Sequence, residues 1–342
     1  MLRAATSGRQ TVIAALALAA LVLARLWSAP TVASRGADGA DTLVLPDGRR
    51  VFARAPAGAA GGAASALYVS PIDGREARRI TFGEARDRAP ALLPDGRIVF
   101  RRHPLEGAAP GRLFVVNPDG TGLQLFSAPA DRASIEGGPW LHDGHVLFTE
   151  KIGEGASERL VSVSPHQPLG ERAILAGGAN GGAEARGSPV SFGKSAQAAA
   201  PQPRPLRLTS VVDERKSSGT LLCLDVYASR LATMAAATGG VVRAVRVLAA
   251  GGTVLGEAPV EDDGSFFIEV PADQPLHLEL LDGTGVRAAD HSGFWVRPNE
   301  NRGCIGCHED PELAPDNRVV RALSRPATPL AAADSQSEAH SP

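Results

Sequence analysis

LPDGRIVF, residues 93–100, lies midway between two close copies of itself, LPDGRRVF at 45–52 and LHDGHVLF at 141–148. The copies are 48 residues apart, and self-similarity at a fixed period of this length marks a repeat architecture. In each copy an Asp-Gly turn leads into a run of β-branched and aromatic residues, which is the chemistry of a β-hairpin. The stretch therefore predicts a mainly β protein built from repeated hairpins.

A second phrase recurs between these copies and supplies the other half of each repeat. It reads LYVSPIDG at 67–74 and LFVVNPDG at 113–120, with a degenerate third copy, LVSVSP, at 160–165. Two hairpins per repeat predict one four-stranded blade of a β-propeller. Closed propellers usually have four to eight blades, and about three can be counted here. We therefore expect a partial or degenerate β-propeller over residues 41–175.

The segment RRITFGEARDRAPALLPDGRIVF, residues 78–100, resembles the periplasmic WD40-like propeller repeats of the TolB type. In those repeats a Thr/Phe stretch, an Asp and then PDG mark successive strands of a blade. The resemblance covers roughly residues 41–165 and implies a β-propeller.

The remainder of the chain divides by composition. Residues 176–205 are rich in Gly, Ala, Ser and Pro and predict a linker. Short β-rich runs between residues 218 and 282, separated by Gly/Asp turns, then predict a small antiparallel β-sandwich-like domain within residues 206–323. A loop carrying a cysteine motif ends this domain, and the tail, residues 324–342, is predicted to be disordered.

The N-terminal segment, residues 1–33, has the pattern of a signal peptide. Arg3 and Arg9 precede an uninterrupted apolar run, residues 12–24, and Thr31 and Ala33 form a small-residue cleavage site. The alternative is an uncleaved membrane anchor, in which Arg25 snorkels to the membrane interface. Both interpretations predict an exported protein, located in the periplasm.

Two of the three cysteines stand in the pentad CIGCH, formed by Cys304, Cys307 and His308. A C-x-x-C-H motif can attach c-type haem, because two thiols add to the vinyl groups while the adjoining histidine binds the iron. The sequence therefore predicts one haem c. A redox dithiol, a structural zinc site and a plain disulfide are the alternatives, although the first lacks a βαβ context and the second a fourth ligand.

The surroundings of the motif are consistent with a bound macrocycle. Gly303 and Gly306 remove side chains where the backbone would pass close to a flat ring. His291, expected in a loop just ahead of the motif, is the candidate sixth iron ligand, while His277 is expected on the polar side of a strand. Without a sixth ligand the iron would be open to a small molecule. Cys223, in an apolar run, is expected to be a buried hydrophobic residue.

From Gly219 onward the chain resembles the middle domain of the hydrazine synthase alpha subunit. The resemblance is carried by GTLLCLDVYASR, LGEAPVEDDGSFFIEVPADQPLHLELLD and, most specifically, FWVRPNENRGCIGCHEDPELAPDNR. It implies covalent haem on Cys304 and Cys307, with His308 adjacent, and it leaves zinc on His308 as an alternative. Hydrazine synthase activity does not carry over, because Glu312 stands where the family offers a tyrosine and the chain has no second C-x-x-C-H.

Charge and motifs exclude several functions. The 35 basic and 37 acidic residues are mixed along the chain, so no field for nucleic acid exists. We expect an exported c-type cytochrome-like protein with a redox partner protein, which touches a membrane only if the N-terminal segment is retained. A non-redox propeller protein with a relic motif and a haem enzyme acting on a small molecule are the alternatives.

Overall fold

Strands make up most of the described residues of the computed structural model, and they group into five sheets. The structure describes residues 34–35, 41–55, 64–71, 75–105, 110–130, 133–153, 158–176, 210–228, 241–284, 287–306 and 319–330. The predicted signal peptide, most of the linker, Met234, Cys307, His308 and Glu312 lie outside these residues. No helix in the described ranges is long and apolar enough to cross a membrane.

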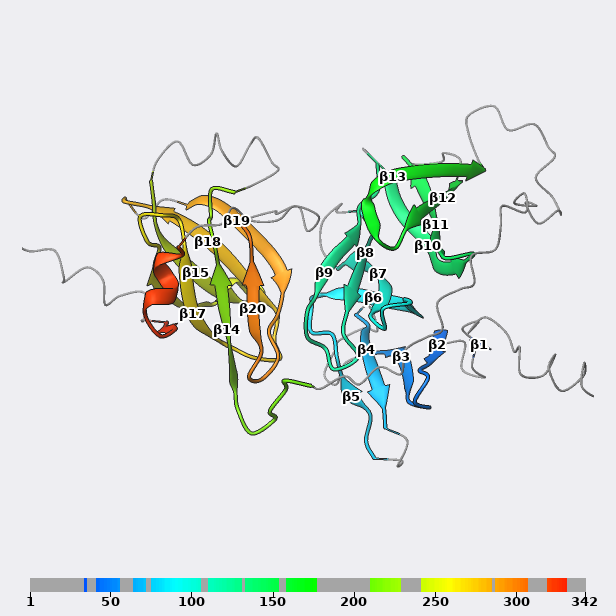
Figure 1. Ribbon diagram of the computed structural model, residues 1–342, viewed down its shortest axis with the longest axis horizontal. Helices are drawn as coiled ribbons and strands as arrows, with labels where there is room; N and C mark the ends of the chain where they lie inside the picture. The colour runs from blue at the N-terminus through cyan, green and yellow to red at the C-terminus, as the bar shows by residue number, and fades with distance from the viewer. Residues whose placement is uncertain are drawn as a thin grey trace, which may run out of the picture. The chain divides into compact units, whose positions relative to one another are not determined.

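The first three sheets are consecutive propeller blades (Figure 1). Blade 1 contains β1 (Ser34–Arg35), β2 (Asp41–Val44), β3 (Arg50–Arg54), β4 (Ala66–Ser70) and β5 (Arg78–Arg79). Blade 2 contains β6 (Ala85–Leu92), β7 (Ile98–Pro104), β8 (Arg112–Val116) and β9 (Gln124–Ser127). Blade 3 contains β10 (Ala133–His142), β11 (His145–Ile152), β12 (Glu158–Ser164) and β13 (Gln167–Ala176). Each strand pairs antiparallel with the next, as the hairpin pattern predicts.

The repeated Asp-Gly turns explain why the blades form at these residues. In blade 2 the amide of Leu93 donates to Arg97 O at 2.8 Å, and Gly96 adopts a φ of 88°. A positive φ favours glycine, which has no Cβ to clash. In blade 3 Asp143 and Gly144, both with positive φ, form a tight two-residue hairpin. The two turn geometries arise because the third copy lacks the proline of the other two.

Two sets of buried side chains hold the blades together. One set joins blade 2 to blade 3 through Val99, Leu113, Val146, Phe148 and Val161. The other joins blade 1 to blade 2 and continues into the C-terminal domain. Among the described residues, neither set contains side chains of both blade 1 and blade 3. The prediction of a mainly β fold with several antiparallel sheets is therefore confirmed, and the partial propeller stays a prediction with which these three sheets agree.

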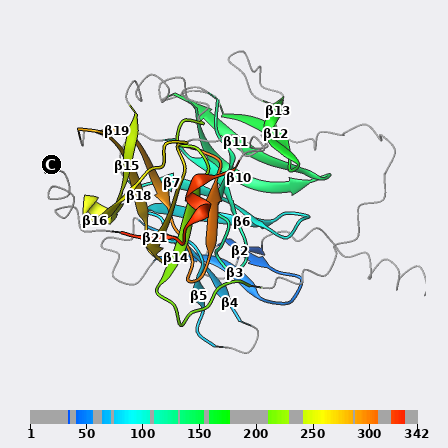
Figure 2. The same cartoon turned by 60° about the vertical axis from the view of Figure 1, so that its left-hand side comes forward.

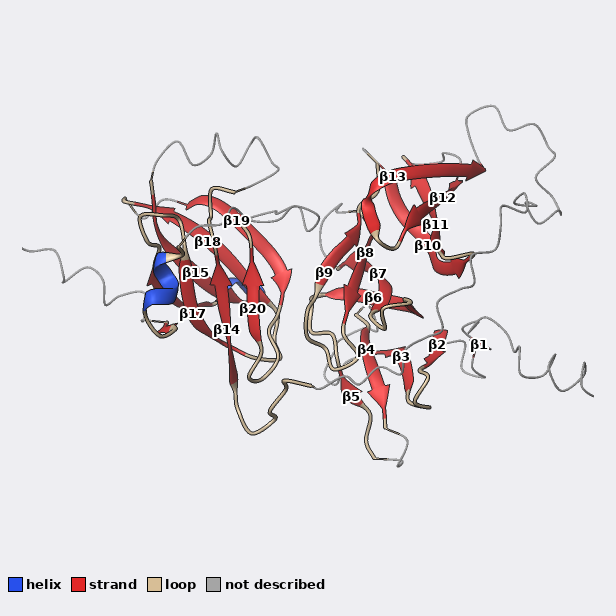
Figure 3. Ribbon diagram, viewed as in Figure 1, coloured by secondary structure: helices blue, strands red, loops and turns tan. Residues whose placement is uncertain are grey.

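The last two sheets form a β-sandwich (Figure 2). One sheet has the order β20 (Asn301–Cys304), β14 (Ser218–Cys223), β17 (Phe266–Pro271), β21 (Thr328–Pro329). The other has the order β16 (Val254–Pro259), β15 (Val242–Ala249), β18 (Leu276–Asp282), β19 (Arg287–Phe294). Two 3-10 turns, η2 (Ala250–Gly252) and η3 (Arg321–Ser324), are the helical elements in the described residues (Figure 3).

The sandwich agrees with the predicted fold class but differs in three details. The pairs β14–β20 and β17–β21 are parallel, so the first sheet is mixed. The approach to the cysteine motif is strand β20 rather than a loop. The predicted disordered tail contributes β21 to the sheet, with Thr328 opposite Ile268. Polar residues such as Asn301 hid these edge strands, because an edge strand need not be apolar on either face.

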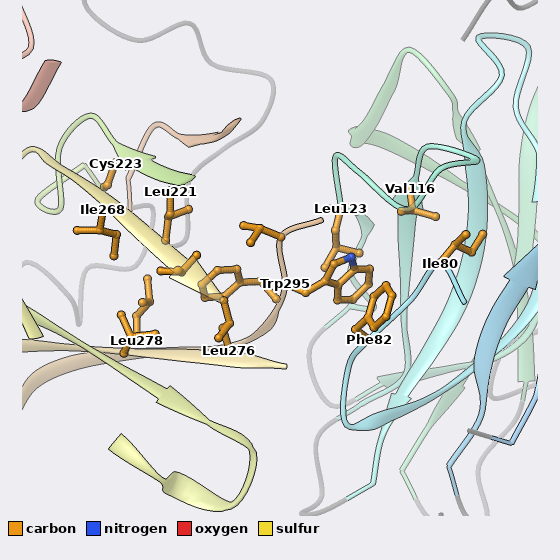
Figure 4. Packing of buried hydrophobic residues seen from close by; sticks show 14 of the residues in the cluster. Ile80, Phe82, Val116, Leu123, Leu221, Cys223, Ile268, Leu276, Leu278 and Trp295 are labelled. Carbon is orange, nitrogen blue, oxygen red and sulfur yellow. The ribbon is translucent and has the colours of Figure 1, made fainter. Parts of the chain in front are cut away.

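A continuous core runs from blade 1 and blade 2 into the sandwich (Figure 4). Trp295, fully buried directly after β19, lies between the two parts. Its indole ring contacts the ring of Phe82 edge to face, with 6.1 Å between centroids, and its Nε1 donates to Gly120 O at 3.0 Å. Residues Ala33–Pro342 accordingly form one compact unit.

Candidate functional site

Cys304, the first cysteine of the motif, ends strand β20 beside β14. Parallel pairing places Cys304 opposite Cys223 in the register of the two strands. Cys223 is 2% exposed, as expected of a buried hydrophobic residue, whereas Cys304 is only partly buried and packs against the same core. The sequence therefore puts one motif cysteine at an accessible edge of the sandwich.

The chain that follows β14 supports the start of the motif through its backbone. The amide of Leu224 donates to Cys304 O at 3.0 Å, and the amide of Asp225 donates to Ile305 O at 3.0 Å. The amide of Ala228 donates in turn to Asp225 O at 3.0 Å, which closes a turn beside the motif. We call residues 223–228 the shelf. The shelf orders the backbone up to Gly306, where the described part of the motif ends.

The two glycines around Cys304 have different surroundings. A Cβ on Gly306 would lie 1.9 Å from Ala228 O, so the shelf itself requires glycine at this position. A Cβ on Gly303 would meet nothing within 4 Å. The protein thus explains Gly306, contrary to the expectation that a macrocycle requires it, and leaves the space beside Gly303 open.

Blade 2 holds the segment that leads to the motif. Four contacts join this segment to the β8–β9 turn: Trp295 Nε1 to Gly120 O (3.0 Å), Arg297 Nε to Asp119 O (3.0 Å), Gly122 N to Glu300 Oε1 (2.8 Å) and Arg302 Nη2 to Leu123 O (2.6 Å). We call this set the clamp. The clamp fixes the propeller against the strand that carries Cys304.

Charged groups at the clamp form ion pairs and hydrogen bonds with one another and with the backbone. The Arg297 guanidinium is buried and forms ion pairs with Asp273 and Glu214, while its amide donates to Glu300 Oε2 at 2.7 Å. Burial raises the pKa of Glu300 above its ordinary value, and hydrogen bonds from Gly122 N and Arg297 N partly offset this effect. These pairings let ionisable groups remain inside the junction.

A second buried ion pair, in blade 2, lies against Trp295 of the clamp. Arg102 on β7 donates from Nε and Nη2 to both carboxylate oxygens of Asp87 on β6, each at 2.7 Å. Its guanidinium carbon also lies 4.8 Å from the ring centroid of Trp295. Asp87 is the aspartate of the TolB-like repeat, so this repeat residue fixes the arginine that contacts the clamp.

The two nearby histidines do not share one environment. His277 Nε2 lies 3.0 Å from Glu84 Oε2, so a hydrogen bond to the residue just before blade 2 engages this nitrogen. His291 lies in strand β19, opposite Leu278, and not in a loop as predicted.

Of the three motif residues that would hold a haem, the structure describes Cys304, whose position is compatible with a thioether bond. Cys304 is accessible at an ordered strand end, and the space beside Gly303 is open. Within the described residues no group of three metal-binding side chains gathers, and this set contains neither Cys307 nor His308. Among the described residues, the start of the motif thus has an ordered support at Cys304 and no neighbour beside Gly303.

The sequence analysis missed the clamp and the shelf. The segment with Arg297, Glu300 and Arg302 was predicted to be a polar loop. Its local sequence does not show that the partners of these side chains are backbone groups of blade 2, about 180 residues earlier. The dense charge in RPNENRG, beside a buried tryptophan, was the available signal. The opposition of Cys223 and Cys304 was also missed, since strand register is not a local property.

Fold and site together define an all-β protein in which propeller blades precede and clamp a β-sandwich with a terminal cysteine motif. Residues 228–309 match the family described as the hydrazine synthase alpha subunit middle domain. The predicted resemblance to this family is therefore confirmed for that segment.

The solved structure of Kuenenia stuttgartiensis hydrazine synthase has a similar fold. It is 18% identical over 85% of this chain and 56% of that chain, with a TM-score of 0.62. This chain thus spans little more than half the length of that relative. An oligogalacturonate lyase in complex with manganese is 15% identical over 38% of each chain, with a TM-score of 0.28. A comparison with curated protein sequences finds no match.

Proposed function

We propose that this chain is an exported c-type cytochrome-like protein that carries one haem c on Cys304 and Cys307 and transfers electrons to a partner protein. His308 would bind the iron. Bound haem supplies a single-electron couple, whose potential is set by its ligands and surroundings. The N-terminal segment supports a periplasmic location, where covalent haem and an exported redox partner would be found.

The observation that carries this proposal is the ordered support of Cys304. β14, the shelf and the clamp hold the strand end through backbone and side-chain hydrogen bonds, while the side of Gly303 is open. A relic motif would need no such support. The similarity of residues 228–309 to the hydrazine synthase alpha middle domain points the same way.

This chain's own residues would orient the group and limit its motion. Cys304, at the end of β20, and Cys307, three residues later, would each form a thioether with one vinyl group of the haem. Arg302, held by Leu123 O and Trp295 O, keeps the preceding strand in place. Preorganised attachment of this kind lowers the reorganisation that accompanies electron transfer.

The decisive experiment compares covalent haem in five proteins made with the c-haem maturation machinery. The wild type and Cys223→Ala should give a haem-stained band after denaturing electrophoresis and a pyridine haemochrome spectrum. Cys304→Ala and Cys307→Ala should lower haem content severalfold, and the double variant should abolish it. Equal haem in the wild type and the double variant would refute the proposal.

A second function is the binding or conversion of a small molecule at an open iron. The positions of the two nearby histidines favour it. His277 is engaged by Glu84, and His291 is tied into β19. A low-spin ferrous spectrum that becomes high-spin in His291→Ala would support the electron carrier. Rapid binding of carbon monoxide to the wild type would favour the small-molecule function.

A further inference from the structure

The outermost blades present two sheet faces that resemble the faces buried inside the propeller. The 48-residue period allows each position in one blade to be compared with the same position in the next. We define the front face of a blade as the face toward the following blade, and the rear face as the face toward the preceding blade. Blade 3 has no described blade in front of it, and blade 1 has none behind it.

Two front-face positions are apolar in all three blades. Val51 and Leu67 in blade 1, and Val99 and Leu113 in blade 2, are fully buried against the following blade. Leu147 and Leu160 occupy the same positions in blade 3 but are partly exposed.

Trp140 pairs across from Leu147 and is 50% exposed. Blade 3 thus ends in the kind of surface that the other blades bury, and an exposed tryptophan beside two leucines is a common feature of docking surfaces.

The rear face of blade 1 shows the reciprocal change. Phe100 in blade 2 and Phe148 in blade 3 are fully buried at one rear-face position, and Phe52 occupies it in blade 1 while partly exposed. Val44, which pairs across from Arg50 on the same face, is 42% exposed. On the same face Tyr68 is buried, and Arg50 stands where the other blades have Ile98 and Val146. The part of this face around Phe52 and Val44 is therefore the candidate counterpart of the front face of blade 3.

We infer that two copies of this chain associate head to tail, with the front face of blade 3 of each copy packed on the rear face of blade 1 of the other. Three blades from each copy make six, within the range of closed propellers. A two-fold axis forms both junctions at once, so the ring closes and no further copies add. Both junctions continue the packing already present between consecutive blades.

Sedimentation of the full chain tests this inference. Trp140→Glu alters the front face of blade 3, and Val44→Glu alters the rear face of blade 1. Val254→Glu is the matched control, because Val254 is also 42% exposed but lies on β16 of the sandwich. We expect the wild type and the control to have the mass of two chains, and each face variant to dissociate with a Kd raised at least about tenfold.

An equimolar mixture of the two face variants identifies the geometry. In a head-to-tail ring the mixed pair has one junction with both changes and one wild-type junction, so the mixture should associate more tightly than either variant alone. A mixture no tighter than the single variants would overturn the inference. A monomeric wild type, loss of association in the control, or assemblies that grow beyond two chains would overturn it as well.

The association is independent of haem, since neither face includes the cysteine motif. We therefore expect the same mass for the wild type and for the variant in which both motif cysteines are alanine. A failure of the inferred association is thus distinguishable from a failure of haem attachment.

Discussion

The two glycines beside Cys304, Gly303 and Gly306, differ in the space around them. The shelf carbonyls leave no room for a side chain at Gly306, whereas Gly303 faces open space. Glycine at 306 is therefore required by the polypeptide, and glycine at 303 has no such requirement within the described residues.

Alanine at these two positions should separate the two roles. Gly306→Ala should lower the free energy of unfolding by about 1–3 kcal/mol, because Ala228 O must move. Gly303→Ala should change it by less than about 0.5 kcal/mol in the haem-free protein. Urea unfolding of the haem-free proteins measures both, and equal effects of the two substitutions would contradict this assignment.

Asp87 is the single residue whose loss should disturb the propeller most. Its removal leaves the Arg102 guanidinium buried without a counter-charge, so Asp87→Ala should cost about 3–5 kcal/mol of unfolding free energy. Asp47→Ala is the control, since the Asp47–Arg49 pair is exposed and worth about 1 kcal/mol or less. If the two variants melt at the same temperature, the Asp87–Arg102 pair does not contribute the predicted stability.

At the scale of elements, the segment between β19 and β20 joins both parts of the chain. It contributes a buried tryptophan, an arginine and a glutamate to the clamp within six residues, and Arg302 follows in β20. Strand β20 then begins directly at Asn301, so motion in the clamp would be transmitted to Cys304.

The free energy of unfolding should depend on pH through the Glu300 carboxyl in the clamp. Because burial raises its pKa above the ordinary 4.5, its contribution to stability is full below pH 4.5 and is lost as pH rises through the folded-state pKa. Glu300→Gln cannot titrate and keeps one acceptor oxygen of two. The stability of the wild type relative to this variant should therefore fall as pH rises above 4.5.

Urea unfolding at a series of pH values measures this difference. Glu158→Gln, a change at an exposed position on β12, is the control and should follow the wild type at every pH. A wild-type advantage over Glu300→Gln that grows with pH would show that the hydrogen bonds outweigh burial at Glu300.

At the scale of the whole molecule, one core cluster extends from blade 1 to the sandwich. Trp295 lies where the two parts meet, and its indole also contacts Phe82 and Arg102. We therefore expect blades and sandwich to unfold together.

Trp295→Ala should uncouple the two parts. Loss of this buried ring should cost about 3–5 kcal/mol and convert one calorimetric transition into two. Trp140→Ala, at an exposed tryptophan of blade 3, should leave a single transition. One undivided transition in Trp295→Ala would mean that the clamp's hydrogen bonds suffice for cooperativity.

The sequence by itself determined the blades, the strands from β14 to β18 and the identity of the cysteine motif. These features depend on local chemistry, since Asp-Gly turns, alternating apolar residues and C-x-x-C-H spacing act over a few neighbouring residues. The spacing of LPDGRIVF from its copies also predicted three successive units of the same kind, which the first three sheets match.

The tertiary structure alone decided which residues support Cys304. Arg297, Glu300 and Arg302 bind backbone carbonyls and an amide of blade 2, and any sequence offers such groups at every residue. Strand β20 is polar and joins the sheet through parallel pairing with β14, a register set by packing and not by its own residues. Contacts between distant segments leave no local periodicity, and for this reason they became visible only when the chain was folded.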